Sequence, residues 1–243
     1  MTQERDRQKA DPDSHRVPRR RIEVGPGIFY WPGRLDRAAQ QTLLGAITAR
    51  VARAPFFRPR MKGTGTPFSV EITNFGSLGW VSDQARGYRY EQRHPETGQP
   101  WPDIPRALLD LWDESTGYRA PPECCLVNLY RSSRARMGLH RDADEAATDA
   151  SVLSVSLGDD ALFRIGGLGR RGATRSFVLG SGDVLVFGGP ARLCYHGIDR
   201  IVPGSSDLVA GGGRINLTLR RVSVPGPGGW AGGGAPPHWV GGQ

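Results

Sequence analysis

The chain has 243 residues, 38% of them hydrophobic, and a formal net charge of +8. This length suits one large domain or two small ones. No apolar run approaches the roughly 20 residues of a membrane helix, so we expect no membrane partner. The basic balance favours a polyanionic partner, nucleic acid first. GC-rich codon usage could equally raise the arginine content, because only Lys9 and Lys62 of the 32 basic residues are lysines.

The cysteines and the N-terminus bear on the cellular compartment. Cys124, Cys125 and Cys194 have no Cys-x-x-Cys spacing, which argues against a disulfide framework and against a zinc site. The segment from Met1 to Arg21 is charged and polar and lacks the apolar part of a secretory signal. We therefore expect a cytoplasmic protein, and we expect it to be a monomer.

Two amphipathic helices are predicted after a disordered basic tail at residues 1–21. The first covers Leu35 to Ala54, with Asp36 as its N-terminal cap. The second covers Ile104 to Thr116 and is expected to stop at Gly117.

Short strand-like runs separated by glycine-rich turns dominate from residue 125 onward, a pattern typical of a sandwich or barrel. The predicted strands are Leu126–Tyr130, Ser151–Leu157, Leu162–Ile165, Ser176–Leu179, Val184–Phe187, Arg192–His196 and Arg214–Val222. Helices first and strands later indicate an α+β fold, with helices on one face of a β core. Residues 223–243 are rich in glycine and proline and are predicted to be disordered.

One glycine motif is excluded as a dinucleotide site. Gly167 to Gly172 fits Gly-x-Gly-x-x-Gly, but a dinucleotide site requires a helix to follow. Here Ser176–Leu179 reads as another strand, so we predict a hairpin loop whose arginines could contact phosphate.

A metal site is suggested by His140-Arg141-Asp142. In an extended chain, residues two apart point to the same side, so both side chains can reach one ion. A third ligand is offered by His196, at the end of a predicted strand and followed by Gly197, where we expect the chain to turn. Two histidines and one carboxylate form the facial triad of non-haem iron(II) oxygenases. His-x-Asp alone is also common in solvated turns.

The run from Arg214 to Arg220 alternates polar and apolar residues. Its polar face carries Arg214, Asn216, Thr218 and Arg220. Arginine binds a carboxylate through two parallel hydrogen bonds, so an inward polar face would suit an acidic cosubstrate. Asn128 and Tyr130 flank Leu129 in the same way. A polar face in contact with water would give the same pattern.

Taken together, these residues resemble the AlkB family of iron(II)- and 2-oxoglutarate-dependent nucleic-acid dealkylases, closest to its bacterial DNA-repair branch. The resemblance runs from about Thr66 to Val222. Its matching segments are Thr73–Trp80, Gly87–Tyr90, Pro100–Pro102, Asn128–Tyr130, His140–Glu145, Val155–Gly158, Gly182–Val184, Tyr195–Gly197 and Arg214–Arg220.

The resemblance implies a double-stranded β-helix, or jelly-roll, core with flanking helices and an N-terminal nucleotide-recognition lid. Accordingly, residues 22–124 are expected to form the extension and lid, and residues 125–222 the catalytic core.

The resemblance also implies the site and its cofactors, which are Fe(II), 2-oxoglutarate and O2. His140, Asp142 and His196 would hold iron. Arg220 would pair with the distal carboxylate of 2-oxoglutarate and Arg214 with its other end, assisted by Asn128, Tyr130 and Asn216. Trp80 would stack on a flipped damaged base opposite His140, Tyr88 and Tyr90 would line the lid and touch backbone phosphate, and Asp144 would sit near the exocyclic amine of the base.

The implied reaction is oxidative demethylation of bases such as 1-methyladenine and 3-methylcytosine in DNA, releasing formaldehyde, succinate and CO2. The alternatives are a demethylase or hydroxylase acting on tRNA, a small-molecule 2-oxoglutarate dioxygenase, and a non-catalytic jelly-roll binding module. An intact triad argues against the last, and Trp80, Tyr88 and the basic loops argue against a small molecule.

Overall fold

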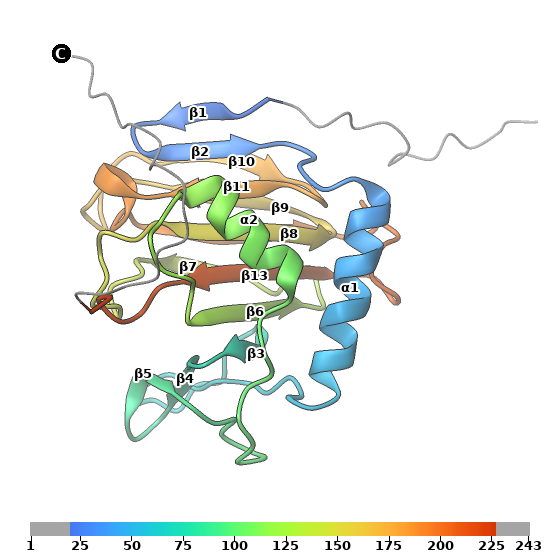
Figure 1. Ribbon diagram of the computed structural model, residues 1–243, viewed down its shortest axis with the longest axis vertical. Coiled ribbons are helices and arrows are strands. Elements are labelled where there is room, and N and C mark those ends of the chain that lie inside the picture. The colour runs from blue at the N-terminus through green and yellow to red at the C-terminus, as the bar shows by residue number, and fades with distance from the viewer. Residues whose placement is uncertain (1–19, 227–243) are drawn as a thin grey trace, which may run out of the picture.

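Two antiparallel β-sheets pack face to face in the computed structural model, which describes residues 20–226 (Figure 1). The larger sheet has the order β1 (Ile22–Gly25), β2 (Ile28–Trp31), β11 (Val184–Phe187), β8 (Val152–Gly158), β13 (Arg214–Arg220), β6 (Cys124–Tyr130) and β3 (Glu71–Gly76). The smaller has the order β10 (Arg175–Leu179), β9 (Asp160–Ile165), β12 (His196–Val202) and β7 (Met137–His140). This is the predicted α+β jelly-roll arrangement. The predicted tails lie outside the described residues, apart from 20–21 and 223–226.

The two predicted helices are confirmed and lie on the outer face of the larger sheet, toward the viewer in Figure 1. They are α1 (Arg37–Val51) and α2 (Arg106–Thr116). The Asp36 carboxylate accepts a hydrogen bond from the Ala39 N–H at 2.8 Å, as an N-terminal cap does. α2 ends where Gly117 adopts a φ of 59°, a left-handed conformation that glycine takes without steric cost. Neither helix has the length and apolar character needed to span a bilayer, and none other occurs in residues 20–226 that could.

β13 explains why one strand can carry an alternating pattern and still be buried throughout. Ile215, Leu217 and Leu219 pack in the apolar layer beneath the helices. The opposite face carries Arg214 and Arg220 between the two sheets, and all seven residues of the strand are buried. Burying such a polar face is costly unless its groups find partners. Of the two alternatives that the alternating pattern allowed, the structure has the inward polar face, with both arginines buried.

One predicted strand is wrong. The segment Arg192–His196 was expected to end in His196, but a short 3-10 helix (Gly189–Ala191) precedes it and β12 begins at His196. Pro190 has no N–H for a ladder, and two glycines before it favour a turn. The chain also does not turn at Gly197, which continues β12. A Cβ atom there would lie 2.5 Å from the Met137 carbonyl oxygen, so glycine permits the close approach of β7 and β12.

The N-terminal part contributes to both the sheet and a separate hairpin. β1, β2 and β3 lie before residue 124 yet belong to the larger sheet, so the β core extends into the predicted N-terminal extension. β4 (Gly79–Asp83) and β5 (Gly87–Glu91) form their own two-stranded hairpin beside the sheets, which we call the lid hairpin (Figure 1). The predicted hairpin around Gly167–Gly172 is present, joining β9 to β10.

Candidate active site

His140 and His196 lie directly opposite each other where β7 pairs with β12, and their ring centroids are 4.5 Å apart. Asp142 follows in the loop after β7. The Nε2 atom of His140 lies 3.8 Å from one carboxylate oxygen of Asp142, and that of His196 lies 3.9 Å from the other. Ligand atoms of the three residues all lie within 4.8 Å of one another, a spacing that can hold a metal ion.

Backbone carbonyls orient both imidazoles. The Nδ1 of His140 lies 2.9 Å from the Gly138 carbonyl oxygen, and the Nδ1 of His196 lies 3.0 Å from that of Cys194. A carbonyl can only accept, so Nδ1 carries the proton and donates it. The lone pair of each Nε2 is then directed toward Asp142. Metal-ligating histidines commonly have this arrangement.

The charge states of Asp142 and His196 suit metal binding. Burial raises the pKa of Asp142, but Arg220, the two histidines and Arg192 together outweigh it and hold this pKa well below its usual range. Arg220 donates to both carboxylate oxygens, from Nε at 3.0 Å and from NH2 at 2.8 Å. Burial, helped by His140, lowers the pKa of His196 to about 4. Asp142 is therefore ionised and His196 neutral near pH 7.

A small pocket of about 60 Å³ extends from the two histidines between the sheets. Its lining includes seven predicted site residues, namely Asn128, Tyr130, His140, His196, Arg214, Asn216 and Arg220. The amide of Asn216 is engaged within the protein, since it donates to Ser154 Oγ at 2.7 Å and accepts from Thr218.

Arg214 is an unusual buried arginine. It has no exposed surface, and its NH2 donates to Ser156 Oγ at 3.1 Å. Its Nε and NH1 have no hydrogen-bond partner, and neither has Oδ1 of Asn128, among the side chains of residues 20–226. Burial also lowers the pKa of Arg214. Unpaired buried donors are costly, so they mark a place for an acceptor such as a carboxylate.

The two arginines of β13 have different partners within the protein. Arg220 was expected at the distal carboxylate of 2-oxoglutarate, but its guanidinium is paired with Asp142 beside the histidines. Arg214 lies six residues away along the strand, about 20 Å by backbone rise. Of these two arginines, Arg214 is the one whose Nε and NH1 have no hydrogen-bond partner among the described residues.

The lid hairpin brings together the predicted base-contacting residues. Trp80 donates its indole N–H to Asp144 at 3.1 Å and stacks on Tyr88, with ring centroids 5.4 Å apart. Tyr88 is 50% exposed, as a surface for stacking would be. Tyr90, for which a phosphate contact is predicted, is partly buried and donates its hydroxyl to Glu145 within the protein.

Sequence reasoning assigned no role to three buried residues near the site. Glu145 and Arg192 form an ion pair at 3.1 Å, and Ser156 supports Arg214. Glu145 belongs to the matched segment His140–Glu145, and Ser156 to Val155–Gly158, but a pattern match says nothing of partners. Arg192 lies in a segment that the sequence predicts as a strand but that forms a loop before β12, so its ion pair could not be predicted.

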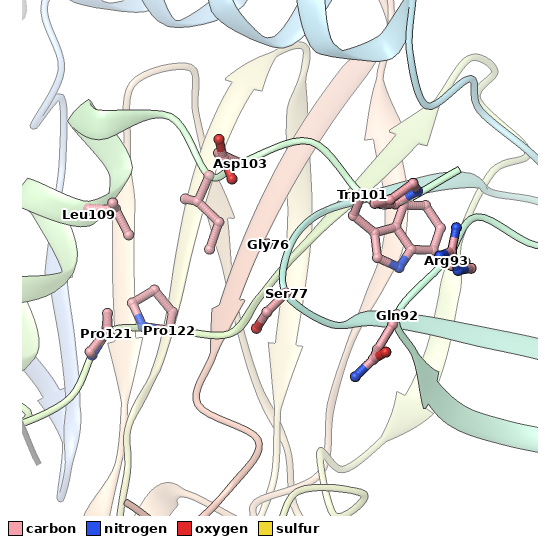
Figure 2. A pocket seen from close by; sticks show the side chains of 11 residues that line it. Gly76, Ser77, Gln92, Arg93, Trp101, Asp103, Leu109, Pro121 and Pro122 are labelled. Atoms are coloured by element: carbon pink, nitrogen blue, oxygen red, sulfur yellow. The ribbon is translucent and has the colours of Figure 1, made fainter. Parts of the chain in front are cut away.

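A second, more open hollow lies between the end of β3, the segment after β5 and the start of α2 (Figure 2). Its volume is about 620 Å³, and it is bordered by residues such as Arg93, Trp101 and Asp103. No predicted site residue lines it. The chemistry is therefore assigned to the pocket between the sheets.

Residues 27–220 match the family model of the 2OG-Fe(II) oxygenase superfamily. The chain belongs to this superfamily, and it is an enzyme of the 2-oxoglutarate-dependent dioxygenase class, with Fe(II), 2-oxoglutarate and O2 as its cofactors. The His140–Asp142–His196 cluster and the free donors of Arg214 fit a metal ion and an acidic cosubstrate.

Within that class, the chain belongs to the AlkB family. It is 60% identical over 201 residues, which are 83% of this chain and 90% of the relative, to an alpha-ketoglutarate-dependent dioxygenase AlkB homolog of Caulobacter vibrioides (strain NA1000 / CB15N). It is 38% identical over 204 residues, 82% of this chain and 92% of the relative, to alpha-ketoglutarate-dependent dioxygenase AlkB of Salmonella typhimurium. The solved structure of OsALKBH1 superposes with a TM-score of 0.71 at 27% identity, covering 83% of this chain and 100% of that one.

Proposed function

We propose that this protein removes methyl groups from the ring nitrogens of DNA bases, such as 1-methyladenine and 3-methylcytosine, by direct oxidation. One observation carries the proposal above all. A single pocket between the sheets is lined by His140 and His196, two members of the His140–Asp142–His196 cluster, and by Arg214, which has two unpaired guanidinium nitrogens. Ligands for a metal and for a dicarboxylate thus share one cavity.

His140, Asp142 and His196 hold the iron in this proposal. Bound iron, together with 2-oxoglutarate and O2, supplies the oxidant that hydroxylates an N-methyl group, which is then lost as formaldehyde while succinate and CO2 form. Arg220 fixes the orientation of the Asp142 carboxylate through two hydrogen bonds. Three protein ligands would leave coordination positions for the cosubstrate and O2.

Arg214 binds the distal carboxylate of 2-oxoglutarate through the two nitrogens that have no partner. Tyr130 lies beneath it, with the guanidinium carbon 5.9 Å from the ring centroid, and Asn128 adds an amide to the same pocket. Burial raises the pKa of Tyr130 to about 12, which keeps its hydroxyl protonated and able to donate to a carboxylate.

A base in a duplex must leave the stack to reach the iron, and a cationic methylated base pairs poorly and flips at lower cost. Trp80 and Tyr88 offer aromatic faces for the flipped base, and Asp144 lies beside Trp80 where an exocyclic amine would come. Exposed arginines of the two loops after β6 and β9 supply positive charge for phosphates; they are Arg131, Arg134, Arg136, Arg170 and Arg171.

The test is anaerobic reconstitution of the full chain with Fe(II) and 2-oxoglutarate, followed by O2 and an oligonucleotide that carries one methylated base. Mass spectrometry follows loss of the methyl group from matched DNA and RNA strands. The proposal predicts loss of 14 mass units from DNA, about one CH2 per turnover, together with formaldehyde. If only the RNA strand lost its methyl group, the substrate would be RNA and not DNA. Consumption of 2-oxoglutarate with neither polymer changed would contradict the proposal.

A further inference from the structure

Glu145 is a buried carboxylate, 5% exposed, that contacts three side chains from separate parts of the chain. The hydroxyl of Tyr90 in the lid hairpin donates to its Oε1. The Arg192 guanidinium lies 3.1 Å from its Oε2, and Arg220 Nε lies 3.6 Å from Oε1. Arg220 lines the pocket between the sheets, whereas Glu145 does not.

Arg192 connects Glu145 to the metal-binding loop. Its NH1 donates to the backbone carbonyl of Asp142 at 2.7 Å, and its Nε donates to the carbonyl of Ala150 at 2.7 Å. Arg192 also precedes His196 by four residues. One side chain therefore fixes the main chain of one proposed ligand relative to the segment that leads into another.

The lid hairpin is attached to this loop at two adjacent points. Trp80 donates to Asp144, and Tyr90 donates to Glu145. Trp80 and Tyr90 are directly opposite each other in the hairpin. The dipeptide that receives them begins two residues after Asp142, so a displacement of the hairpin would act on the metal-binding loop.

The buried charges around Glu145 balance. Two carboxylates, Asp142 and Glu145, face two guanidinium groups, Arg192 and Arg220, and each of the four residues is 2–6% exposed. In a low-dielectric interior such a set holds its geometry firmly, because separating one charge leaves another unpaired. The set can therefore transmit a change at Tyr90 to Asp142.

We propose that Glu145 is a positioning residue that couples the lid hairpin to the metal site. The contact from Tyr90 then strengthens metal binding, and metal binding in turn orders the hairpin, since coupling between two binding events is reciprocal. The inference rests on the proposed function only in taking His140, Asp142 and His196 as the metal ligands.

The first test titrates the full-length protein with Co(II), a redox-inert probe for the Fe(II) site, in the presence of 2-oxoglutarate. Groups that orient metal ligands typically change affinity by about 10–100-fold when replaced, so Glu145→Gln should bind Co(II) at least about tenfold more weakly. Tyr90→Phe removes one hydroxyl and should weaken binding severalfold. The double variant should bind no more weakly than Glu145→Gln alone, because the two changes break one connection.

Asp199→Asn serves as the matched control. Asp199 is also an ion-paired acid on β12, 2.8 Å from Arg164, and lies outside the pocket. Its substitution should leave Co(II) affinity unchanged. Tyr90→Phe binding Co(II) as tightly as the wild type, or the two single effects adding in the double variant, would overturn the coupling.

Hydrogen exchange gives the reciprocal readout. Adding Co(II) should raise the protection of backbone amides in Gly79–Asp83 and Gly87–Glu91 in the wild type but not in Tyr90→Phe. Equal gains in both proteins would also overturn the proposal. Neither measurement involves nucleic acid, so failure to demethylate an oligonucleotide would count against the proposed function alone.

Discussion

Replacement of Arg214 by methionine tests two effects of this residue separately. One is its binding of 2-oxoglutarate, and the other is the destabilisation of the folded protein by its buried, unpaired donors. The Nε and NH1 of Arg214 are buried without partners, and we assign both to the distal carboxylate of 2-oxoglutarate. A hydrogen bond to a charged group contributes about 1.5–3 kcal/mol, so losing two costs at least about 3 kcal/mol, more than a hundredfold in affinity. Methionine fills a similar volume and removes the unpaired donors. Without ligand, the free energy of unfolding of Arg214→Met should therefore be at least that of the wild type.

Thermal unfolding with Mn(II), with and without 2-oxoglutarate, measures both effects. A ligand at one hundred times its Kd stabilises by about 2.7 kcal/mol, roughly 5–11 °C for a domain of this size. At the same concentration Arg214→Met should gain only about 0.4 kcal/mol, roughly 1 °C. The control is Arg164→Met, which removes another arginine with an unpaired buried Nε but lies on the outer face of β9. An undiminished shift in Arg214→Met would refute this assignment.

Three further predictions concern the metal ligands and the lid. Asp142→Ala should abolish Co(II) binding and lower the free energy of unfolding by about 3–5 kcal/mol, because it leaves two buried guanidinium groups with the single carboxylate of Glu145. Retention of wild-type Co(II) affinity in a titration would show that Asp142 is not a ligand. The metal-free protein should lose roughly 3 kcal/mol of its free energy of unfolding as pH falls from about 6.5 to about 4, as measured by urea unfolding. In the unfolded chain His196 takes up a proton near its ordinary pKa of 6.5, whereas in the folded protein burial lowers this pKa to about 4. His196→Gln should flatten that slope, and an unchanged slope would mean that another group causes it. Trp80→Ala should raise the KM for a methylated oligonucleotide about 5–150-fold through loss of stacking, with 2-oxoglutarate affinity unchanged; equal KM values in steady-state assays would exclude Trp80 from base binding.

The parts of the fold that follow from local pattern could be predicted from the sequence. The helix beginning after Asp36 and the one ending at Gly117 depend on capping and spacing within a few residues. The alternation in β13 identified the two faces of the strand correctly. The strands β1 to β5 and β7 escaped prediction because strands of four to six residues have little periodicity of their own.

The site could be predicted in its residue types but not in its connections. His140 and Asp142 are close in sequence, and the motif pointed to His196. The pairing of Arg220 with Asp142 and the isolation of Arg214 depend on how the two sheets pack, because β13 and β7 belong to different sheets. The Glu145–Arg192 pair joins two loops 47 residues apart, and no local rule foresees it.

The central claim is that one pocket couples oxidation of 2-oxoglutarate to loss of a methyl group from a nucleic-acid base. A single-turnover experiment tests it most directly, with enzyme, Fe(II), 2-oxoglutarate and a DNA strand containing 1-methyladenine mixed with O2 and quenched over time. Succinate, formaldehyde and unmethylated adenine should appear together in equal amounts in the wild type, and none should form with His140→Ala. Succinate formation with the methyl group retained, or undiminished demethylation by His140→Ala, would contradict it.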